Sequence, residues 1–246
     1  MLVGMALVLS VLIKTFLVQP FFIPSESMEK TLHGCPGCTA DRILVDKVSY
    51  RFHGPKPGDI VVFRGPRSWT PEAPPPSGGM LSRIGGYLGM PRSDEEDFVK
   101  RVVAVGGQKV ACCDRKGRVT VDGKPLEEPY IYQNSPAAQR EFGPVTVPAD
   151  RLWVMGDHRS ASADSRSHID DRSAGTVSVD DVIGRAFVIV WPLSRTTVLR
   201  VPDTFDESAL GAAAGAGFGA TPLALGLLAA VPVRGAGRRL RRRLTR

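Results

Sequence analysis

Two residues far apart in this sequence of 246 residues have the types that a serine nucleophile and its base require. Ser27 stands in Pro-Ser-Glu-Ser-Met, directly after an apolar segment, and a serine hydroxyl is a poor nucleophile until a base removes its proton. Lys100 lies in the run Phe-Val-Lys-Arg-Val-Val-Ala-Val over 98–105, where burial would disfavour the charged amine and lower its pKa. A neutral lysine amine is a suitable general base. A turn serine and an edge strand with two solvated charges are the ordinary alternatives.

A third segment, 155–166, gathers small and charged residues directly after a predicted strand. Ser162 could hydrogen-bond a lysine amine there, while Asp164 and Arg166 could pair and shape the loop. The Asp-His dipeptide at 157–158 would suggest a Ser-His-Asp triad. An aspartate adjacent in sequence to its histidine usually cannot reach the outer imidazole nitrogen, which disfavours that interpretation.

The tetrapeptide from Ser27 to Lys30 also matches the Ser-x-x-Lys motif of β-lactamases and penicillin-binding proteins. Those enzymes further need Ser-Asp-Asn and Lys-Thr-Gly elements, and neither occurs in this sequence. The sequence also lacks the long helical periodicity that their core requires. This motif is therefore not taken as a functional match.

The elements that must position these residues are predicted to be short strands. Seven β-branched runs are bounded by Gly, Pro or Asp, at 43–48, 59–64, 98–105, 109–111, 118–121, 151–155 and 182–190. Asp122-Gly123 is a strong signal for a two-residue hairpin turn. Residues 65–97 are rich in Pro and Gly and end in an acidic patch, which predicts an insertion or mobile loop outside the core. A mostly β, antiparallel domain follows, spanning residues 21–205.

An apolar segment at the start of the chain is predicted to anchor it in a membrane. Residues 1–23 carry one charge, Lys14, and reach the length of a spanning helix only if this lysine is tolerated near one end. A cleavable signal peptide would need a basic start and an Ala-x-Ala-like exit, and both are missing. We therefore assign 1–20 to an uncleaved anchor and leave open a longer natural N-terminus.

A second uncharged segment, 209–233, is long enough to span and is followed by a tail, 234–246, with seven arginines and no acid. The net charge of +7 therefore resides in this tail, which argues against nucleic-acid binding by the folded body. The positive-inside rule places the tail in the cytoplasm and the domain between the two spans outside it. A flexible Ala/Gly linker with a nucleic-acid-binding tail is the alternative.

Four cysteines fit an oxidising exterior and favour structural disulfides. Cys35 and Cys38 form a CxxC motif, whereas Cys112 and Cys113 are adjacent. Four cysteines allow three pairings, and the sequence does not select one. A zinc site built from all four is disfavoured, because vicinal cysteines are poor ligand spacing.

Taken together and in order, these segments resemble the bacterial type I signal peptidases. The resemblance is carried by five segments, namely the anchor, PSESMxxTL at 24–32, GDIVVF at 58–63, KRV with a Gly-Gly pair at 100–107, and GDxRxxSxDSR at 156–166. Two positions depart from the usual pattern, since Glu26 often reads Gly and His158 often reads Asn. The Gly/Ala-rich second span with its arginine tail looks actinobacterial.

The resemblance implies a LexA-like antiparallel β fold and a membrane-bound serine endopeptidase that removes signal peptides from exported preproteins after small residues. Its implied dyad is Ser27 as nucleophile and Lys100 as base, with Ser162 holding the amine and Ser25 helping to stabilise the oxyanion. The remaining residues that it implies are the supporting ion-pair partners Asp164, Arg166, Asp157 and Arg101, and the substrate-pocket residues Phe21, Ile23, Leu32, Phe98 and Val99. It implies no metal or cofactor, no nucleic acid, and contact with the bilayer and proximity to the secretion translocon.

Two other functions remain as alternatives. A LexA-type self-cleaving regulator uses the same dyad on a related β fold, but it would carry a soluble DNA-binding domain in place of an anchor. A catalytically inactive, membrane-anchored β scaffold would not need the whole set of catalytic residues.

Overall fold

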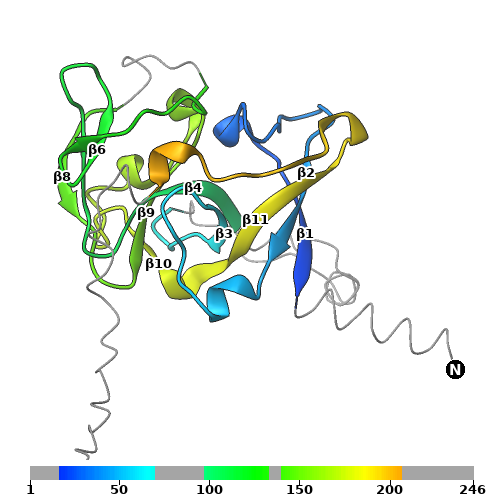
Figure 1. Ribbon diagram of the computed structural model, residues 1–246, viewed down its shortest axis with the longest axis horizontal. Helices are drawn as coiled ribbons and strands as arrows, with labels where there is room; N and C mark the ends of the chain where they lie inside the picture. The colour runs from blue at the N-terminus through cyan, green and yellow to red at the C-terminus, as the bar shows by residue number, and fades with distance from the viewer. Residues whose placement is uncertain (1–16, 70–96, 133–139, 207–246) are drawn as a thin grey trace, which may run out of the picture. The chain divides into compact units, whose positions relative to one another are not determined.

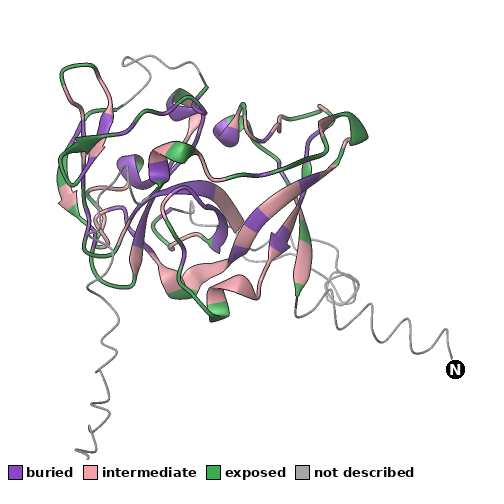
Figure 2. Ribbon diagram, in the orientation of Figure 1, coloured by how far each residue is buried: buried purple, intermediate pink, exposed green. Residues whose placement is uncertain are grey.

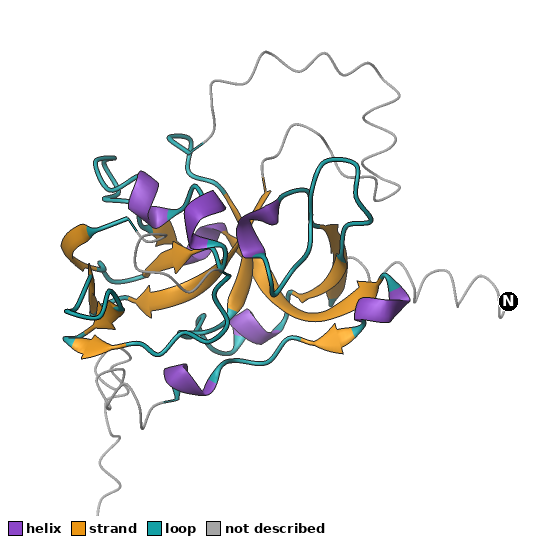
Figure 3. Ribbon diagram, turned by 90° about the horizontal axis from the view of Figure 1, so that it is seen from above, coloured by secondary structure: helices purple, strands orange, loops and turns teal. Residues whose placement is uncertain are grey.

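The computed structural model describes residues 17–69, 97–132 and 140–206 (Figure 1). These ranges consist of strands and short 3-10 helices (Figure 3), which confirms the mostly β prediction. In them, no helix has the length and apolar character needed to cross a bilayer. The second expected span, 209–233, the arginine tail and residues 1–16 of the anchor lie outside the described residues.

The larger sheet has eight antiparallel strands in the order β1-β2-β11-β3-β4-β9-β10, with β12 paired to β11. The bounds of these strands are β1 Val18–Phe22, β2 Arg42–Asp46, β3 Ile60–Arg64, β4 Asp97–Val105, β9 Arg151–Met155, β10 Val177–Ser178, β11 Val182–Trp191 and β12 Thr197–Val198. Strand β4 lies between β3 and β9, and its residues from Lys100 to Ala104 are all buried. This central position is what removes the Lys100 side chain from water.

The smaller sheet has four antiparallel strands in the order β7-β6-β5-β8. Its strands are β5 Lys109–Cys112, β6 Val119–Val121, β7 Lys124–Pro125 and β8 Phe142–Thr146. The predicted hairpin turn is confirmed between β6 and β7, where Asp122 and Gly123 both have positive φ, 52° and 77°. A turn of this hand matches the twist of the two strands that it joins.

Short 3-10 helices connect the strands, and three of them carry residues of the chemistry-bearing motifs. Their bounds are η1 Glu26–Met28, η2 Ser49–Arg51, η4 Arg159–Ala161, η5 Ser165–Ser167, η6 Val179–Asp181, η7 Leu193–Arg195 and η8 Asp203–Phe205. Helix η1 holds Ser27, and η4 and η5 flank Ser162 and Asp164. Ser27, Ser162 and Asp164 therefore sit on tight turns between strands, whereas Lys100 lies within β4.

Buried residues form three clusters, which Figure 2 shows as purple segments of the strands. One cluster joins the two sheets, and within it the rings of Phe142 from β8 and Trp153 from β9 lie 5.0 Å apart. A second cluster packs Met28 and Leu32 against β2, β3 and β11. Because Met28 follows Ser27 directly, this packing fixes the turn that carries the serine.

All seven predicted strand runs occur in the structure, with ends that differ by at most two residues. Two boundaries need correction. Strand β1 pairs Val18–Phe22 with β2, so the segment 1–20 assigned to the anchor ends in a strand and not in a helix. Residues 65–97 are not all outside the core either, because Trp69 is 6% exposed and packs on Phe63 and Phe98. Residues 70–96 lie outside the described part of the chain.

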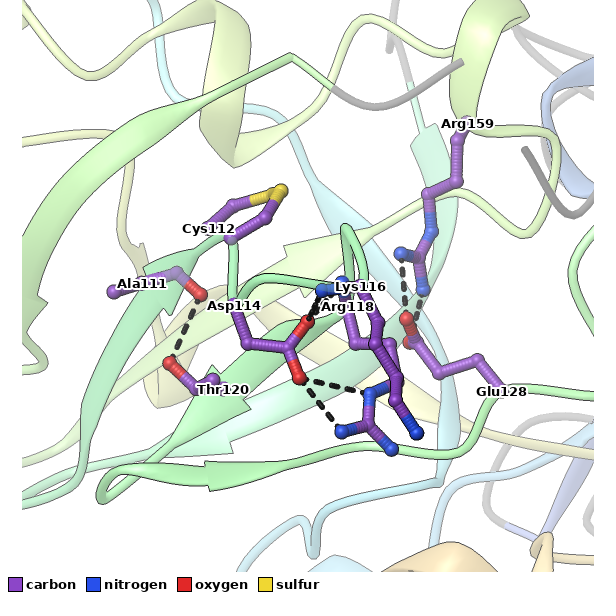
Figure 4. Close-up of a disulfide and its surroundings, with 9 residues drawn as sticks. Ala111, Cys112, Asp114, Lys116, Arg118, Thr120, Glu128 and Arg159 are labelled. Carbon is purple, nitrogen blue, oxygen red and sulfur yellow. Dashed lines mark hydrogen bonds and ion pairs between the residues drawn. A yellow bond between two sulfur atoms is a disulfide. The ribbon is translucent and has the colours of Figure 1, made fainter. Parts of the chain in front are cut away.

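The four cysteines pair within their own motifs, Cys35 with Cys38 and Cys112 with Cys113. Figure 4 shows the disulfide at Cys112. This supports structural disulfides over a zinc site built from all four residues. The adjacent Cys112 and Cys113 stand at the end of β5, beside the turn in which Asp114 pairs with Arg118.

A buried ion pair links the segment after β7 to the loop after β9. Arg159 Nη1 donates to Glu128 Oε2 at 3.0 Å, and its Nη2 donates to the other carboxylate oxygen (Figure 4). Tyr130 donates its hydroxyl hydrogen to Glu128 at 2.6 Å. Glu128 and Arg159 are only 6% and 3% exposed. Charges buried to this degree need such partners, since desolvation costs several kcal/mol per ion.

Replacing Glu128 by Ala should therefore destabilise the protein by about 3–5 kcal/mol, because the buried Arg159 guanidinium loses the carboxylate that neutralises it. Its neighbour Glu127 is exposed and pairs with Arg118 at the surface, so Glu127→Ala should cost less than about 1 kcal/mol. Urea denaturation of both variants in detergent, followed by tryptophan fluorescence, tests this difference. Equal midpoints for the two variants would refute it.

Candidate active site

Ser27 sits in the middle of η1 and is 7% exposed. The turn is closed by the Glu29 backbone N–H, which donates to Glu26 O at 3.0 Å. A three-residue helix has little stability of its own, so contacts from other segments must hold its position. Two such contacts reach it from the loop after β9. The His158 backbone N–H donates to Ser27 O at 3.1 Å, and His158 Nδ1 lies 3.2 Å from Glu26 O.

Lys100 reaches this serine from the centre of β4. Its Nζ donates a hydrogen bond to Ser27 Oγ at 2.7 Å, although 73 residues separate the two in sequence. The lysine is only 4% exposed. Burial lowers the pKa of Lys100 from 10.5 to about 8, against the opposing effect of the Asp164 and Asp157 carboxylates. The amine is therefore largely available as a base at mildly alkaline pH.

Ser25 and Ser162 differ in their hydrogen bonding. The Ser25 hydroxyl donates to Ser27 Oγ at 3.3 Å, and the residue itself is exposed. The expected hydrogen bond from Ser162 to the Lys100 amine is absent, because Ser162 Oγ is buried without a hydrogen-bond partner. This hydroxyl lies near Asp164 and helps to lower its pKa, but the geometry falls short of a hydrogen bond.

Gly156 shows how closely Ser162 approaches the nucleophile turn. A methyl group at Gly156 would stand 2.3 Å from Ser162 Oγ and 2.4 Å from Ser27 O. Both atoms therefore rest against the same glycine, and no other residue type leaves room for them. The Ser162 hydroxyl, which lacks a hydrogen-bond partner, therefore lies close to the main chain of Ser27.

Two buried ion pairs lie close enough to the lysine for their charges to act on its pKa, and both pairs were implied by the family resemblance. Arg101 donates to Asp157 through Nε at 2.8 Å and Nη2 at 2.6 Å, and Thr31 adds a hydroxyl at 2.5 Å. Arg166 donates to Asp164 through Nε at 2.9 Å and Nη2 at 2.8 Å. Bidentate pairs of this kind fix geometry as well as neutralise charge.

The Asp164 carboxylate is also tied to the strand that precedes it, because the Gly156 backbone N–H donates to it at 2.9 Å. Burial alone would raise the pKa of Asp164, but the Arg166 guanidinium and this backbone N–H bring it below its ordinary value. Asp164 is therefore ionised at neutral pH and holds the loop from Gly156 to Arg166 closed.

Comparison with known proteins places this arrangement in a family. The sequence profile of the family described as "Signal peptidase, peptidase S26" matches residues 1–191. Signal peptidase I of Mycobacterium tuberculosis is 49% identical over 213 residues, which cover 79% of this chain and 72% of the relative. The probable signal peptidase I of Mycobacterium leprae is 50% identical over 206 residues, covering 74% and 71%. Signal peptidase I of Leptolyngbya laminosa is 36% identical over 203 residues, covering 82% and 83%.

The chain belongs to the signal peptidase family, peptidase S26. This confirms the expected enzyme class, a serine endopeptidase that cleaves signal peptides, and the mycobacterial relatives agree with the actinobacterial resemblance. A solved signal peptidase I of Enterococcus faecalis aligns with a TM-score of 0.34 at 22% identity, over 53% of this chain and 95% of that one. The family assignment therefore rests on the sequences. This assignment to the signal peptidase family leaves the two alternatives, a LexA-type regulator and a β-lactamase-like enzyme, without support.

The five residues expected to line the substrate pocket of this peptidase divide between two clusters. Phe21, Ile23, Leu32 and Val99 share one cluster, in which Ile23 and Leu32 are 2% and 0% exposed. Phe98 instead packs with Phe63 and Trp69 in another cluster. Phe21 and Val99 are half-buried, whereas Ile23 and Leu32 of the same cluster are buried.

Sequence reasoning missed the His158 contacts with the nucleophile turn and the Glu128–Arg159 pair of the peptidase. Arg159 was part of a motif, but nothing in the pattern around Glu128 marks it as buried. His158 was considered only as a triad base, whereas its backbone and ring bond the carbonyls beside Ser27. Neither the His158 contacts nor the Glu128–Arg159 pair can be recognised from the sequence, because the partners lie 31 to 132 residues apart in the chain.

Gly156→Ala should lower kcat of the peptidase by about 100-fold, because the added methyl would push Ser162 or the Ser27 main chain out of place. Gly143 in β8 has open space at the corresponding position, so Gly143→Ala should keep normal turnover. Steady-state cleavage of a preprotein by both variants measures the effect, with near-ultraviolet circular dichroism as a check of folding. A folded Gly156→Ala enzyme with normal kcat would show that the close approach has no catalytic consequence.

Proposed function

We propose that this signal peptidase cleaves preproteins with Ser27 as nucleophile and Lys100 as general base. The observation that carries the proposal is the 2.7 Å contact between the buried Lys100 Nζ and Ser27 Oγ. With the amine neutral, its lone pair accepts the serine proton as Oγ attacks the scissile carbonyl carbon. The resulting ammonium returns that proton to the leaving amine when the peptide C–N bond breaks. The acyl-enzyme ester is then hydrolysed by water, with the same amine as base.

The tetrahedral intermediate needs donors for its oxyanion. The Ser27 backbone N–H and the exposed Ser25 hydroxyl are the candidates, because the hydroxyl lies 3.3 Å from the nucleophilic oxygen and can turn toward the substrate. A preorganised donor of this type stabilises the transition state by about 3 kcal/mol. The Arg101–Asp157 and Asp164–Arg166 pairs support this geometry without taking part in bond formation. Ser162, beside Gly156, is a candidate to bond the Lys100 amine once substrate is bound.

The substrate is proposed to bind as an extended strand that ends in small residues before the cut. A strand-like peptide can add main-chain hydrogen bonds to an exposed backbone, while shallow pockets select alternate side chains. Phe21 and Val99 would form the apolar surface of those pockets, backed by Ile23 and Leu32, with Phe98 nearby on β4. A surface backed by such bulky buried residues leaves room for alanine-sized side chains only.

We further propose that the domain works at the outer face of the cytoplasmic membrane, near the translocon. The apolar stretch at the start of the chain, assigned to 1–20 from the sequence, supports a first span, and the uncharged segment 209–233 supports a second. The seven arginines of 234–246 support a tail in the cytoplasm. The described domain would then begin at the bilayer surface, where a signal peptide's cleavage site emerges.

A tag on the arginine tail should resist external protease in intact cells, and its digestion there would rule out this orientation.

Ser27→Ala should abolish preprotein cleavage, and Lys100→Met should lower it by about 10²–10⁴-fold, since each removes one partner of the proton transfer. Lys109→Met is the matched control, because Lys109 is exposed on β5 and should leave turnover unchanged. Cleavage of a preprotein in detergent, followed by gel electrophoresis, measures all three. Near-normal turnover by either dyad variant would disprove the assignment.

The pH dependence follows from the lowered pKa of Lys100, about 8. Only the neutral amine acts as base, so kcat/KM should rise with pH up to about 8 and fall about tenfold per unit below it. The measurement is a pH–rate profile under conditions where the fold is retained. A profile that is flat down to pH 5 would contradict a neutral lysine base.

A further inference from the structure

The loop that follows the nucleophile turn brings three metal-ligand side chains together. The side-chain ligand atoms of His33, Cys35 and Cys38 all lie within 4.8 Å of one another. All three residues are partly exposed, so a cation can reach them from solvent. The signal peptidase reaction, as derived above, uses none of them.

The fold holds this loop at both ends. The His33 backbone N–H donates to Asp41 Oδ2 at 2.8 Å, and the Asp41 backbone N–H returns a bond to His33 O at 2.8 Å. Arg195 neutralises the same carboxylate at 2.8 Å. At Gly34 the loop rests on the main chain before Ser27, where a methyl would stand 2.3 Å from Ile23 O. The contacts that hold the two ends of this loop therefore do not involve Cys35 or Cys38.

A carboxylate orients the histidine. Glu29 Oε1 lies 2.5 Å from His33 Nδ1, which leaves Nε2 as the ring nitrogen free to ligate. Metal-bound histidines commonly donate their other ring N–H to a carboxylate in this way. The spacing Cys-x-x-Cys is that of zinc sites, and two thiolates with one imidazole suit Zn²⁺ above harder cations.

We propose that His33, Cys35 and Cys38 form a binding site for a thiophilic divalent cation of the zinc class when the Cys35–Cys38 bridge is reduced. A dithiol or phosphine reductant supplies two electrons, which break the S–S bond, and two protons complete the thiols. Zn²⁺ then displaces both thiol protons and takes Nε2 of His33 as third ligand, with water at the fourth position. Glu29 is a positioning residue for His33 and not a ligand.

The second cysteine pair provides an internal comparison. Cys112 and Cys113 are adjacent in sequence and pair with each other, and no histidine or carboxylate of the described residues joins them in a ligand cluster. Reduction exposes thiols at both pairs, but only the first has a third ligand and a suitable spacing. The proposal therefore predicts one metal site and not two.

The test uses the full chain in detergent, reduced with a phosphine under argon, loaded with Zn²⁺ and freed of excess metal. About one equivalent of zinc per chain should remain, and none should remain on the oxidised protein. Co²⁺ loaded in place of Zn²⁺ should give thiolate-to-cobalt charge-transfer absorption and the intense visible bands of tetrahedral coordination. A reduced wild-type chain that retains no zinc would overturn the proposal.

The variants locate the site. Cys35→Ser and Cys38→Ser should lose the metal, His33→Gln should bind at least about tenfold more weakly, and Glu29→Gln about tenfold more weakly. A Cys112→Ser/Cys113→Ser double variant should bind as the wild type does. Retention of full affinity by His33→Gln or by either single cysteine variant would refute the assignment. Ser27→Ala should still bind zinc, so a failure of this site and a failure of the catalytic dyad give different results.

Discussion

The exclusion of water from the Lys100 amine is the constraint on which the arrangement of this protein depends. A change in pKa from 10.5 to about 8 corresponds to about 3 kcal/mol against the charged form, and this must be supplied by folding. Strand β4 provides it, because β3 and β9 cover both of its edges and its own apolar side chains belong to all three hydrophobic clusters. A lysine on an edge strand would stay solvated and protonated. The central place of β4 in the sheet thus matters for the proposed base as well as for the structure.

Burying a base beside two carboxylates creates a second requirement. Asp157 and Asp164 both favour a charged lysine, and unopposed they would raise its pKa again. Each is held by two guanidinium nitrogens of its own arginine, Arg101 or Arg166, so each pair presents little net charge to the amine. The same pairs bind the loop after β9 to β4 and to Gly156. Neutralising the carboxylates and fixing the loop are therefore accomplished by the same hydrogen bonds.

Which features could be predicted from the sequence depends on how far apart in the chain the interacting residues lie. The strands, the Asp122-Gly123 turn and the Asp164–Arg166 pair are local, and each was predictable from spacing and residue type. Lys100 was detectable because a charge in a continuous apolar run is unusual. Contacts between loops and residues far apart in the chain were not detectable, which is why the Glu128–Arg159 pair and the burial of Trp69 were missed. The prediction for Ser162 was correct only in part. Its place in the loop beside Asp164 agrees with the structure, but the expected hydrogen bond to the Lys100 amine is absent.

The turn that carries Ser27, the proposed nucleophile, depends more than any other part of the site on contacts from distant segments. Helix η1 has three residues, and its cap residue Ser25 makes no capping bond from its side chain, so local propensity cannot define the position of Ser27. Its carbonyl is bonded by the His158 N–H, its oxygen by Lys100, and the next side chain, Met28, is buried among strands from elsewhere in the chain. Each of these supports comes from a segment far away in sequence. The proposed dyad is thus assembled only when the whole sheet has formed, since the fold that lowers the lysine pKa is also the fold that places the serine hydroxyl against it.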